Sequence, residues 1–314
     1  MKVLLTGASG FVGRAMQVCL RDAGHECVAV TRQSTILPNG RETLALGNIS
    51  AQTDWQEVLD GVECVVHLAG QAHVAGKAAL NVQATFNAVN VEATINLVEQ
   101  AINQRVKRFV YVSSIGVHGA TSNDTFITEA SPFIPYSPYT HSKYDAEKAL
   151  QRLAAHSQME WVIVRPPLIY AADAPGNFRQ LLGIVEKGYP LPFAGLSNRR
   201  SMVALENVVD FLMCCCTHDK ASNQAFVISD GQELSTTEIV TTLASGMGKR
   251  QCLFWIPDLL IKMGAALLGR QHTYTQLFGS LQVDSGKARL LLGWRPVIST
   301  HDGLVKAGRE FLGK

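Results

Sequence analysis

Short apolar runs alternate with helical patterns over the first 166 residues of the chain. The runs are KVLLT (2–6), CVAVT (27–31), CVVHLA (64–69), KRFVYVSS (107–114) and WVIVRP (161–166). Strands that are buried on both faces have nearly continuous apolar sequences, and helices between them connect parallel strands. The alternation therefore predicts an α/β fold in which helices cover both faces of a doubly wound parallel sheet.

Two long helices are expected beside this sheet. Residues 80–104 carry apolar side chains at helical spacing, and Ser137 followed by Pro138 is a typical start of a second helix. Such helices could pair with the same helices of a second copy. Beyond Arg165 the alternation gives way to a loop rich in proline, alanine and glycine, although AFVIS (225–229) has the character of a strand that could rejoin the sheet.

The composition is that of a globular protein with a sizeable core. The 314 residues are 47% hydrophobic and carry a net charge of +2, without a basic run, which argues against a nucleic-acid partner. The longest apolar stretches fall short of the ~20 residues that cross a bilayer, so no membrane partner is expected. The seven cysteines form no CxxC pair and are typical of a reducing compartment. We therefore expect a soluble cytoplasmic protein.

A glycine turn follows the first predicted strand. In GASGFVG, Gly7, Gly10 and Gly13 stand three residues apart just where a helix is expected to begin. Glycine permits the tight turn, lets backbone N–H groups approach a pyrophosphate, and brings the helix close to the strand. Because the turn lies in the first βαβ unit, the sequence predicts a dinucleotide site.

The end of the second strand bears on the choice of dinucleotide. An NAD site usually has a carboxylate there, but this chain has Thr31 and Arg32. A guanidinium can hold a 2′-phosphate through two hydrogen bonds, so Arg32 favours NADP, with NAD as the alternative. Asn48 and Ile49 follow a later strand at a place where the adenine ring would pass.

A tyrosine and a lysine lie one helical turn apart in SPYTHSK. Tyr139 and Lys143 would share one helix face, and Ser114 ends the strand KRFVYVSS at the carboxyl edge of the sheet, where ligands of such folds bind. An ammonium group roughly 5 Å from the phenol would favour the phenolate by ~3 kcal/mol, or about two pKa units. We therefore expect Lys143 to lower the pKa of Tyr139, so that the phenol exchanges a proton with a sugar or alcohol oxygen that Ser114 holds.

These motifs together resemble those of the extended short-chain dehydrogenase/reductase family, over nearly the whole chain. They are TGASGFVG, VVHLAG (65–70), VNVEAT (89–94), VSS (112–114) and YTHSK. The chain is most similar to the nucleotide-sugar branch, which includes UDP-galactose 4-epimerase and 4-keto-6-deoxy-sugar reductases. This resemblance implies a seven-stranded Rossmann-type sheet, a smaller C-terminal substrate lobe, and a homodimer formed by the two long helices.

The resemblance also implies domains and site residues. We expect a dinucleotide-binding domain over 1–168 and 201–231, and a nucleotide-sugar lobe over 169–200 and 232–314. The catalytic residues would be Ser114, Tyr139 and Lys143. The substrate diphosphate would meet Asn177 and Arg200, with Arg199 as the rival of Arg200 and Arg270 as a guess. The cofactor contacts would be Gly7, Gly10, Phe11, Val12, Gly13, Arg32, Asn48, Ile49, Leu68, Ala69, Gly70, Asn90, Tyr139, Lys143 and Pro166.

Two departures from the family pattern bear on the substrate lobe. The loop YAAD (170–173) lacks the glycine that commonly follows the tyrosine, and no second diphosphate arginine can be aligned near the C-terminus. The four histidines His67, His73, His118 and His141 show no ligand spacing, so no metal site is expected.

The expected reaction is hydride transfer at C4 of a UDP-linked hexose. Reduction of a UDP-4-keto-6-deoxy-N-acetylhexosamine is the first hypothesis, because Arg32 favours NADP, and a role in cell-surface polysaccharide synthesis would follow. A UDP-glucose or UDP-N-acetylglucosamine 4-epimerase is the alternative, and a non-catalytic dinucleotide sensor is a remote one. Dehydration is disfavoured because Ile115 and Gly116, rather than two acids, follow Ser114.

Overall fold

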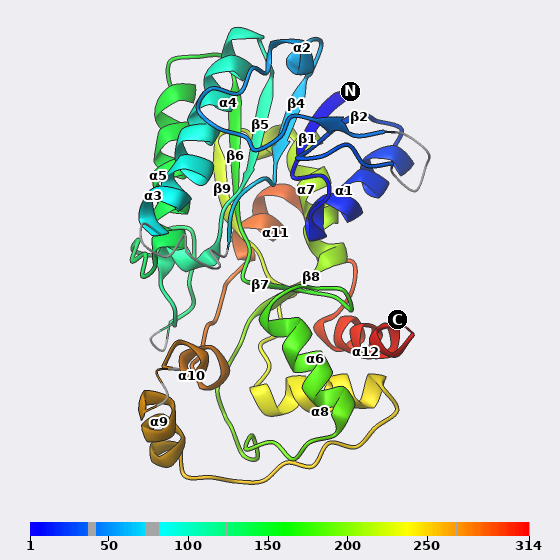
Figure 1. The fold of residues 1–314 in the computed structure, drawn as a ribbon, viewed down its shortest axis with the longest axis vertical. Coiled ribbons are helices and arrows are strands. Elements are labelled where there is room, and N and C mark those ends of the chain that lie inside the picture. Colours follow the sequence, from blue (N-terminus) through cyan, green and yellow to red (C-terminus); the bar gives the residue numbers. More distant parts are fainter. Residues whose placement is uncertain (37–41, 73–81, 123–124, 268, 270, 314) are drawn as a thin grey trace.

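A seven-stranded sheet forms the centre of the protein (Figure 1). The computed structural model describes residues 1–36, 42–72, 82–122, 125–267, 269 and 271–313. The strands are β1 (Lys2–Thr6), β2 (Glu26–Thr31), β3 (Leu44–Ala45), β4 (Cys64–His67), β5 (Arg108–Val112), β6 (Glu160–Arg165) and β9 (Gln224–Val227). They lie in the order β3-β2-β1-β4-β5-β6-β9, and each neighbouring pair is parallel. The predicted doubly wound sheet is confirmed, including the return of the AFVIS segment as β9.

Successive strand residues supply two cores, one on each face of the sheet. Leu5 packs with residues of the first face and Leu4 with residues of the second, as the two-residue period of a strand requires. Helices α1 (Phe11–Asp22), α7 (Leu205–Thr217) and α11 (Gly286–Leu292) cover the first face. Helices α2 (Gln56–Leu59), α4 (Ala93–Asn103) and α5 (Pro138–Ala154) cover the second. The strand order reverses between β1 and β4, which opens a crevice at their carboxyl ends.

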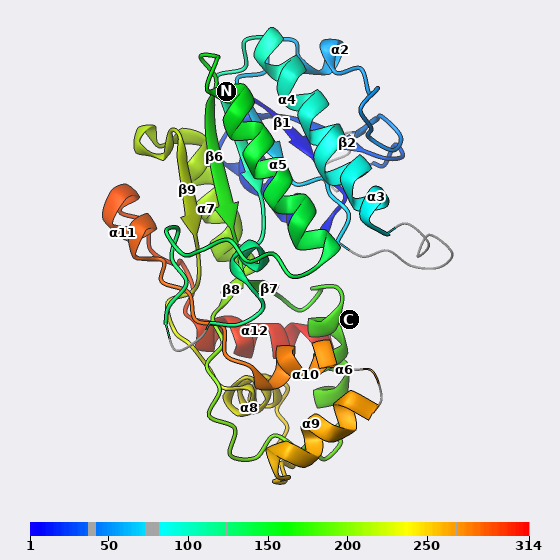
Figure 2. The same ribbon diagram turned by 90° about the vertical axis from the view of Figure 1, so that its left-hand side faces the viewer.

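The two predicted long helices lie side by side on one face of the sheet (Figure 2). The first is described from Val82 and runs through α3 (Val82–Phe86), a π-helical stretch (Asn87–Glu92) and α4. The second, α5, begins at Ser137 with a capping box, because the Ser137 hydroxyl accepts from Thr140 N at 3.2 Å and Thr140 Oγ1 accepts from Ser137 N at 3.0 Å. The predicted start of this helix is confirmed.

A smaller lobe lies beyond the carboxyl edge of the sheet (Figures 1 and 2). Its elements are β7 (Leu168–Tyr170), β8 (Met202–Ala204), α6 (Asn177–Lys187), α8 (Thr236–Gly246), α9 (Asp258–Leu267), α10 (Gln271–Phe278) and α12 (Thr300–Leu312). Tyr170, Phe178 and Leu243 are among the apolar residues of its separate core. The domain boundaries expected from the sequence stay a prediction. Among the described residues, no helix has both the length and the apolar character needed to span a membrane.

Candidate active site

The turn between β1 and α1 is packed so tightly that it has no room for a side chain at Gly7 or Gly13. Gly7 has a φ of +68°, and a Cβ built on it would lie 2.7 Å from Ala69 N. A Cβ on Gly13 would lie 2.2 Å from the carbonyl oxygen of Gly7. Both glycines are therefore required, one by its left-handed backbone and the other by the close approach of helix to turn.

A groove of about 750 Å³ runs over this turn, at the carboxyl ends of β1, β2 and β4. Eight of the residues predicted to bind the cofactor line it: Gly7, Gly10, Arg32, Asn48, Ile49, Leu68, Ala69 and Gly70. Thr6, Ser9, Gln71, Ala72 and Val89 also line it and were not predicted as contacts, although Thr6, Ser9 and Val89 belong to the motifs TGASGFVG and VNVEAT. The groove lies at the carboxyl edge of the sheet, and its glycines leave backbone N–H groups open to a bound dinucleotide.

The other predicted cofactor residues lie around the groove rather than in its lining. The side chains of Phe11 and Val12 pack on the hydrophobic clusters beside α1. Pro166 accepts a hydrogen bond from Ile115 N at 3.0 Å, and its neighbour Pro167 lines the adjacent pocket. Their cofactor roles stay predictions.

A polar hollow adjoins the groove at the end of β2. Ser9, Arg32, Gln33, Thr35, Gly47 and Asn48 line its volume of about 550 Å³. The Thr31 hydroxyl beside it donates to Gln33 O at 2.8 Å. No carboxylate is found among the described residues that line the hollow or the groove.

The predicted catalytic residues come together from two parts of the fold, the end of β5 and helix α5. Ser114, which follows β5, and Tyr139, in the first turn of α5, line a pocket of about 570 Å³. Lys143 lies one turn further along α5 and is buried, with its Nζ donating to Val112 O at 2.9 Å. This pocket and the dinucleotide groove share Ala72, so the two sites meet beside the catalytic residues.

Residues of the C-terminal lobe form the far wall of this pocket. Asn177 and Arg200 line it as predicted, whereas Arg199 is absent from the described lining. Asn177 Nδ2 donates to Gln276 Oε1 at 2.5 Å, and Arg200 Nη1 donates to Gly279 O at 3.0 Å. Arg270 lies outside the described residues. Gln276 was missed because α10 is brought to the pocket only by tertiary packing.

Comparison with known proteins identifies the family. Residues 3–229 match the family model "NAD dependent epimerase/dehydratase family". The chain belongs to this family. It is 36% identical to a UDP-glucose 4-epimerase of Vibrio cholerae, over 99% of this chain and 95% of that protein. It is 26% identical to the N-acetyl-α-D-glucosaminyl-diphospho-ditrans,octacis-undecaprenol 4-epimerase of Escherichia coli O157:H7, over 85% of this chain and 77% of that one.

A solved structure of MoeE5 in complex with UDP-glucose and NAD shares the fold, with a TM-score of 0.78 at 23% identity over 99% of this chain and 100% of that one. The resemblance to the nucleotide-sugar branch of the extended short-chain dehydrogenase/reductases is confirmed. The chain is therefore an enzyme of the NAD-dependent epimerase/dehydratase type.

The pKa values of the catalytic pair differ from what the sequence led us to expect. Burial raises the pKa of Tyr139 to about 12, and a hydrogen bond with Ser114 opposes the rise only in part. Burial also lowers the pKa of Lys143 to about 8, against the attraction of Glu147. The expectation that Lys143 would lower the pKa of Tyr139 is wrong for this structure, because the loss of solvation dominates and the Lys143 ammonium is turned to Val112 O.

Asn90 connects the groove to the active-site helix of this family member. Its side-chain oxygen accepts from Gln71 N at 2.8 Å, and its nitrogen donates to Ser142 Oγ at 2.9 Å. Ser142 in turn donates to Tyr139 O at 2.8 Å. A Cβ on Gly70 would lie 3.1 Å from the Asn90 oxygen, so the groove is narrow here. Asn90 therefore connects the Gln71 backbone to α5 through Ser142, while its contact with the cofactor stays a prediction.

A buried ion pair behind α5 was not foreseen. Arg165 at the end of β6 donates to Glu147 Oε2 at 2.7 Å and lies 3.1 Å from His118 Nε2. The Arg165 and Glu147 side chains are only 3% and 2% exposed. Glu147 lies one turn beyond Lys143, so the ion pair fixes the helix that carries Tyr139 and Lys143, the two predicted catalytic residues of α5. The sequence does not indicate this ion pair, because an arginine and a glutamate far apart in the chain are usually both exposed to solvent.

The histidines that the structure describes do not gather into a metal site. His67 lies between Thr6 Oγ1 at 2.7 Å and Thr94 Oγ1 at 3.0 Å, and burial lowers its pKa to about 3, so it stays neutral. His141 is exposed, and His73 lies outside the described residues. Within the part of the chain that the structure describes, no three His, Cys, Asp or Glu side chains could hold a metal ion.

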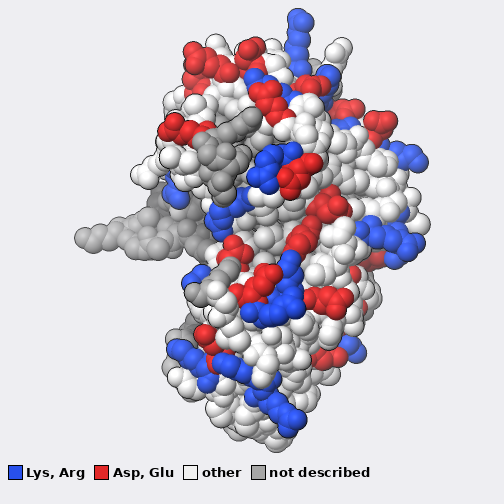
Figure 3. Space-filling view, turned by 90° about the vertical axis from the view of Figure 1, so that its right-hand side faces the viewer, with Lys and Arg blue, Asp and Glu red and all other residues white. Residues whose placement is uncertain are grey.

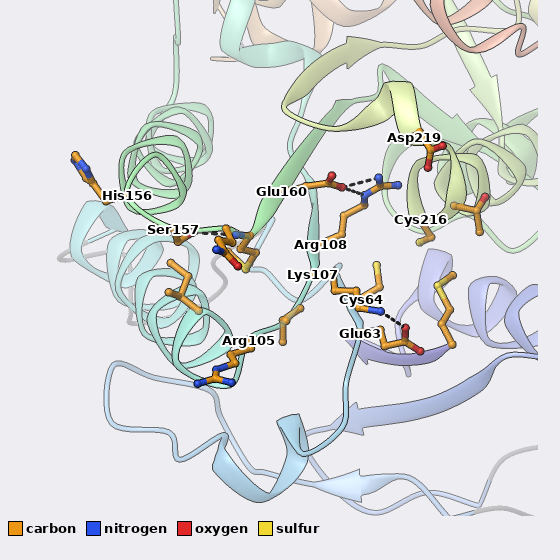
Figure 4. Close-up of a pocket in the computed structure, with 16 residues that line it drawn as sticks. Glu63, Cys64, Arg105, Lys107, Arg108, His156, Ser157, Glu160, Cys216 and Asp219 are labelled. Atoms are coloured by element: carbon orange, nitrogen blue, oxygen red, sulfur yellow. Dashed lines mark hydrogen bonds and ion pairs between the residues drawn. The ribbon is translucent and has the colours of Figure 1, made fainter.

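A further pocket of about 660 Å³ opens at the opposite, amino edge of the sheet (Figure 4). Its charged groups largely neutralise one another: Lys107 Nζ lies 2.8 Å from Glu63 Oε2, and Arg108 Nη2 lies 2.6 Å from Glu160 Oε2. Arg108 also donates to Cys215 O at 3.0 Å near the end of α7. These contacts join strands to helix and pair four of the charged side chains that line the pocket, which points to a structural role for them.

Proposed function

We propose that the protein is a 4-epimerase of UDP-hexoses, with UDP-glucose or UDP-N-acetylglucosamine as substrate. The observation that carries the proposal is the pocket that holds Ser114 and Tyr139 and joins the dinucleotide groove at Ala72. A sugar in this pocket would present its C4 to the end of the groove. The Vibrio cholerae UDP-glucose 4-epimerase at 36% identity supports the epimerase over the reductase that the sequence first favoured.

The residues of the chain take distinct roles in this reaction. Tyr139 would exchange a proton with O4, and Ser114 would hold that oxygen by a hydrogen bond. Asn177 and Arg200 would bind the diphosphate from the opposite wall, where a guanidinium suits two adjacent phosphates. The close-packed glycine turn fits NAD, which when bound would accept hydride from C4 and return it. Lys143 would bind the nicotinamide ribose.

Reduction of a UDP-4-keto-6-deoxy-N-acetylhexosamine with NADPH is the second candidate. The polar hollow beside Arg32 favours it, since a hydroxyl, a guanidinium and amides there could hold a 2′-phosphate. Dehydration has less support. The described pocket lining contains no Asp or Glu, and a Cβ on Gly116 would lie 2.6 Å from Thr140 Cγ2, so no acid could replace it there.

One pair of assays separates the candidates. Purified protein is incubated with UDP-glucose and with UDP-N-acetylglucosamine without added cofactor, and proton NMR follows the 4-epimers. An epimerase converts them and releases NAD on denaturation, whereas a reductase consumes NADPH at 340 nm with the keto sugar. Tyr139→Phe should lower kcat by a factor of about 10² to 10⁴, the usual contribution of a general acid–base. Cofactor binding without turnover of any of these sugars would instead support the sensor.

We also propose a homodimer formed through α3, α4 and α5. These helices lie side by side on one side of the sheet, with part of each exposed (Figure 2). Light scattering would give a mass of twice 34.1 kDa for the dimer. A monomer at micromolar concentration would count against it.

A further inference from the structure

The substrate pocket contains a second tyrosine, Tyr136, three residues before Tyr139. Tyr136 lies directly ahead of Ser137, the residue that caps α5. Its backbone N–H donates to Thr140 Oγ1 at 2.9 Å, so the hydroxyl that completes the capping box also holds the backbone of Tyr136. Tyr136 is therefore fixed to the same helix end that presents Tyr139 to the pocket.

The ring of Tyr136 borders the part of the pocket that the Ser114 hydroxyl also borders. Both side chains lie beside Gly116, which lines the pocket as well. A Cβ built on Gly116 would lie 3.3 Å from Ser114 Oγ and 3.5 Å from Tyr136 Cε1. One point next to Gly116 is thus in contact distance of both side chains, so a ligand held by Ser114 would lie close to the ring of Tyr136.

The hydroxyl end of Tyr136 is turned into the pocket, although 45% of the residue is exposed. Loss of solvation raises the pKa of this phenol, and the nearby Arg200 guanidinium opposes the rise. A negative charge on Tyr136 would in turn raise the pKa of Tyr139. The Tyr136 hydroxyl is therefore close to both Arg200 and Tyr139. In a UDP-hexose the sugar ring separates the diphosphate from O4, so a phenol near both groups is placed at the sugar ring.

The protein surface gives little help in orienting such a substrate. Figure 3 shows acidic and basic side chains mixed over the face that carries α1 and α12. The net charge of the chain is only +2. Long-range attraction of an anionic nucleotide sugar should therefore be weak, and its orientation depends on contacts inside the pocket.

A tyrosine is well suited to contact a hexose. Its ring presents a flat apolar surface to the C–H groups of the sugar, and its hydroxyl can form a hydrogen bond with a sugar hydroxyl. Few rotatable bonds have to be ordered when such a side chain meets a ligand. The apolar side chains that line the same pocket, such as Ile115 and Leu168, can supply only the first kind of contact.

We propose that Tyr136 is a substrate-binding residue that contacts the hexose ring, with its hydroxyl bonded to a sugar hydroxyl other than O4. This inference rests on the proposed function, because it requires a UDP-hexose whose O4 lies at Ser114 and Tyr139. The contact does not involve the reacting atoms, so it stabilises the bound substrate and the transition state alike. Its loss should raise KM and leave kcat nearly unchanged.

Calorimetry in the Tyr139→Phe background, where turnover is suppressed, separates the sugar from the nucleotide. Adding Tyr136→Phe should raise the Kd of UDP-glucose and UDP-N-acetylglucosamine about three- to tenfold, the usual effect of one hydrogen bond. The Kd of UDP should stay within about twofold, because UDP has no hexose. Arg200→Ala should weaken the binding of all three ligands, since each has the diphosphate. The matched control is Tyr189→Phe, at a tyrosine 56% exposed outside the described pocket lining, and it should change none of these values.

Steady-state rates of the chain with Tyr139 intact give a second measurement. Tyr136→Phe should raise KM for the UDP-hexose about three- to tenfold and change kcat less than about twofold. A role confined to holding α5 would lower kcat at unchanged KM, and that result would overturn the inference. Unchanged affinity for the UDP-hexoses, or an equal loss of affinity for UDP, would also overturn it. If the protein with Tyr136 intact binds UDP but neither UDP-hexose, the proposed function fails and this inference fails with it.

Discussion

Replacing Glu147 by glutamine removes one charge from the ion pair behind the active-site helix. The carboxylate accepts from Arg165 Nη2 at 2.7 Å and from Arg165 Nε at 3.0 Å, and both side chains are almost completely buried. Glutamine could still accept a hydrogen bond from Arg165, but its uncharged amide no longer neutralises the buried guanidinium, whose other neighbours include His118 and the Phe133 ring. The variant therefore contains a buried positive charge without the negative charge that neutralises it in the wild type.

Glu147→Gln should lower the free energy of unfolding far more than the loss of an exposed ion pair does. Breaking a buried pair by removal of one partner destabilises by about 3–5 kcal/mol. The matched control is Glu63→Gln, because Glu63 accepts from Lys107 at the same kind of distance, 2.8 Å, with side chains 41% and 74% exposed. Solvent screens that pair, so its loss should cost less than about 1 kcal/mol.

Urea denaturation of the wild type and both variants measures these costs. Glu147→Gln should lower the midpoint strongly with an unchanged slope, and it should lower kcat because α5 carries Tyr139 and Lys143. The double variant Glu147→Leu with Arg165→Met should recover stability, since no isolated charge remains. A cost for Glu147→Gln no greater than that for Glu63→Gln would refute the reasoning that burial makes this pair different.

Three more results are expected. Gly13→Ala should weaken NAD binding at least tenfold in calorimetry, because its Cβ would lie 2.2 Å from Gly7 O; unchanged affinity would contradict the close packing. The pKa of Lys143 is about 8, against 10.5 in the unfolded chain, so the unfolded chain binds more protons between these values. The free energy of unfolding should therefore rise by about 2 kcal/mol more in the wild type than in Lys143→Met between pH 7.5 and 9.5. Asn90→Ala, which loses the bond to Ser142 Oγ, should lower kcat more than it raises KM, as steady-state rates would reveal.

The sheet could be predicted because each local signal agreed with the whole fold. Apolar strands such as 64–67, the glycine turn after β1 and the cap at Ser137 each point to the same α/β arrangement. The π-helical stretch around Asn90 could not be predicted, since its apolar spacing differs little from that of an α-helix. The hydrogen bonds of the Asn90 side chain distinguish this stretch in the structure, and the spacing of apolar residues does not reveal them.

Some residues of the candidate site could be predicted from the sequence, and others could not. Gly7 and Ser114 could be placed because each directly follows a strand, and parallel strands end at one edge of the sheet. Asn177 and Arg200 came from the family resemblance alone, because residues 169–200 show no spacing that fixes their position. Gln276 reaches the pocket from a helix almost 100 residues further on, and only the packing of the lobe brings it there.

The pKa of Tyr139 shows where charge reasoning from sequence is incomplete. Spacing along a helix correctly puts Lys143 near the phenol, but it does not say where the ammonium points or how much water remains. Lys143 Nζ donates to Val112 O and lies 4.7 Å from the centre of the Tyr111 ring, and its charge does not offset the effect of burial on the phenol. Removal of water then raises the pKa of Tyr139 to about 12 and keeps the phenol protonated near neutral pH. In the proposed reaction this protonated phenol could donate a proton to the sugar oxygen, whereas accepting the O4 proton requires a lower phenol pKa than burial alone gives.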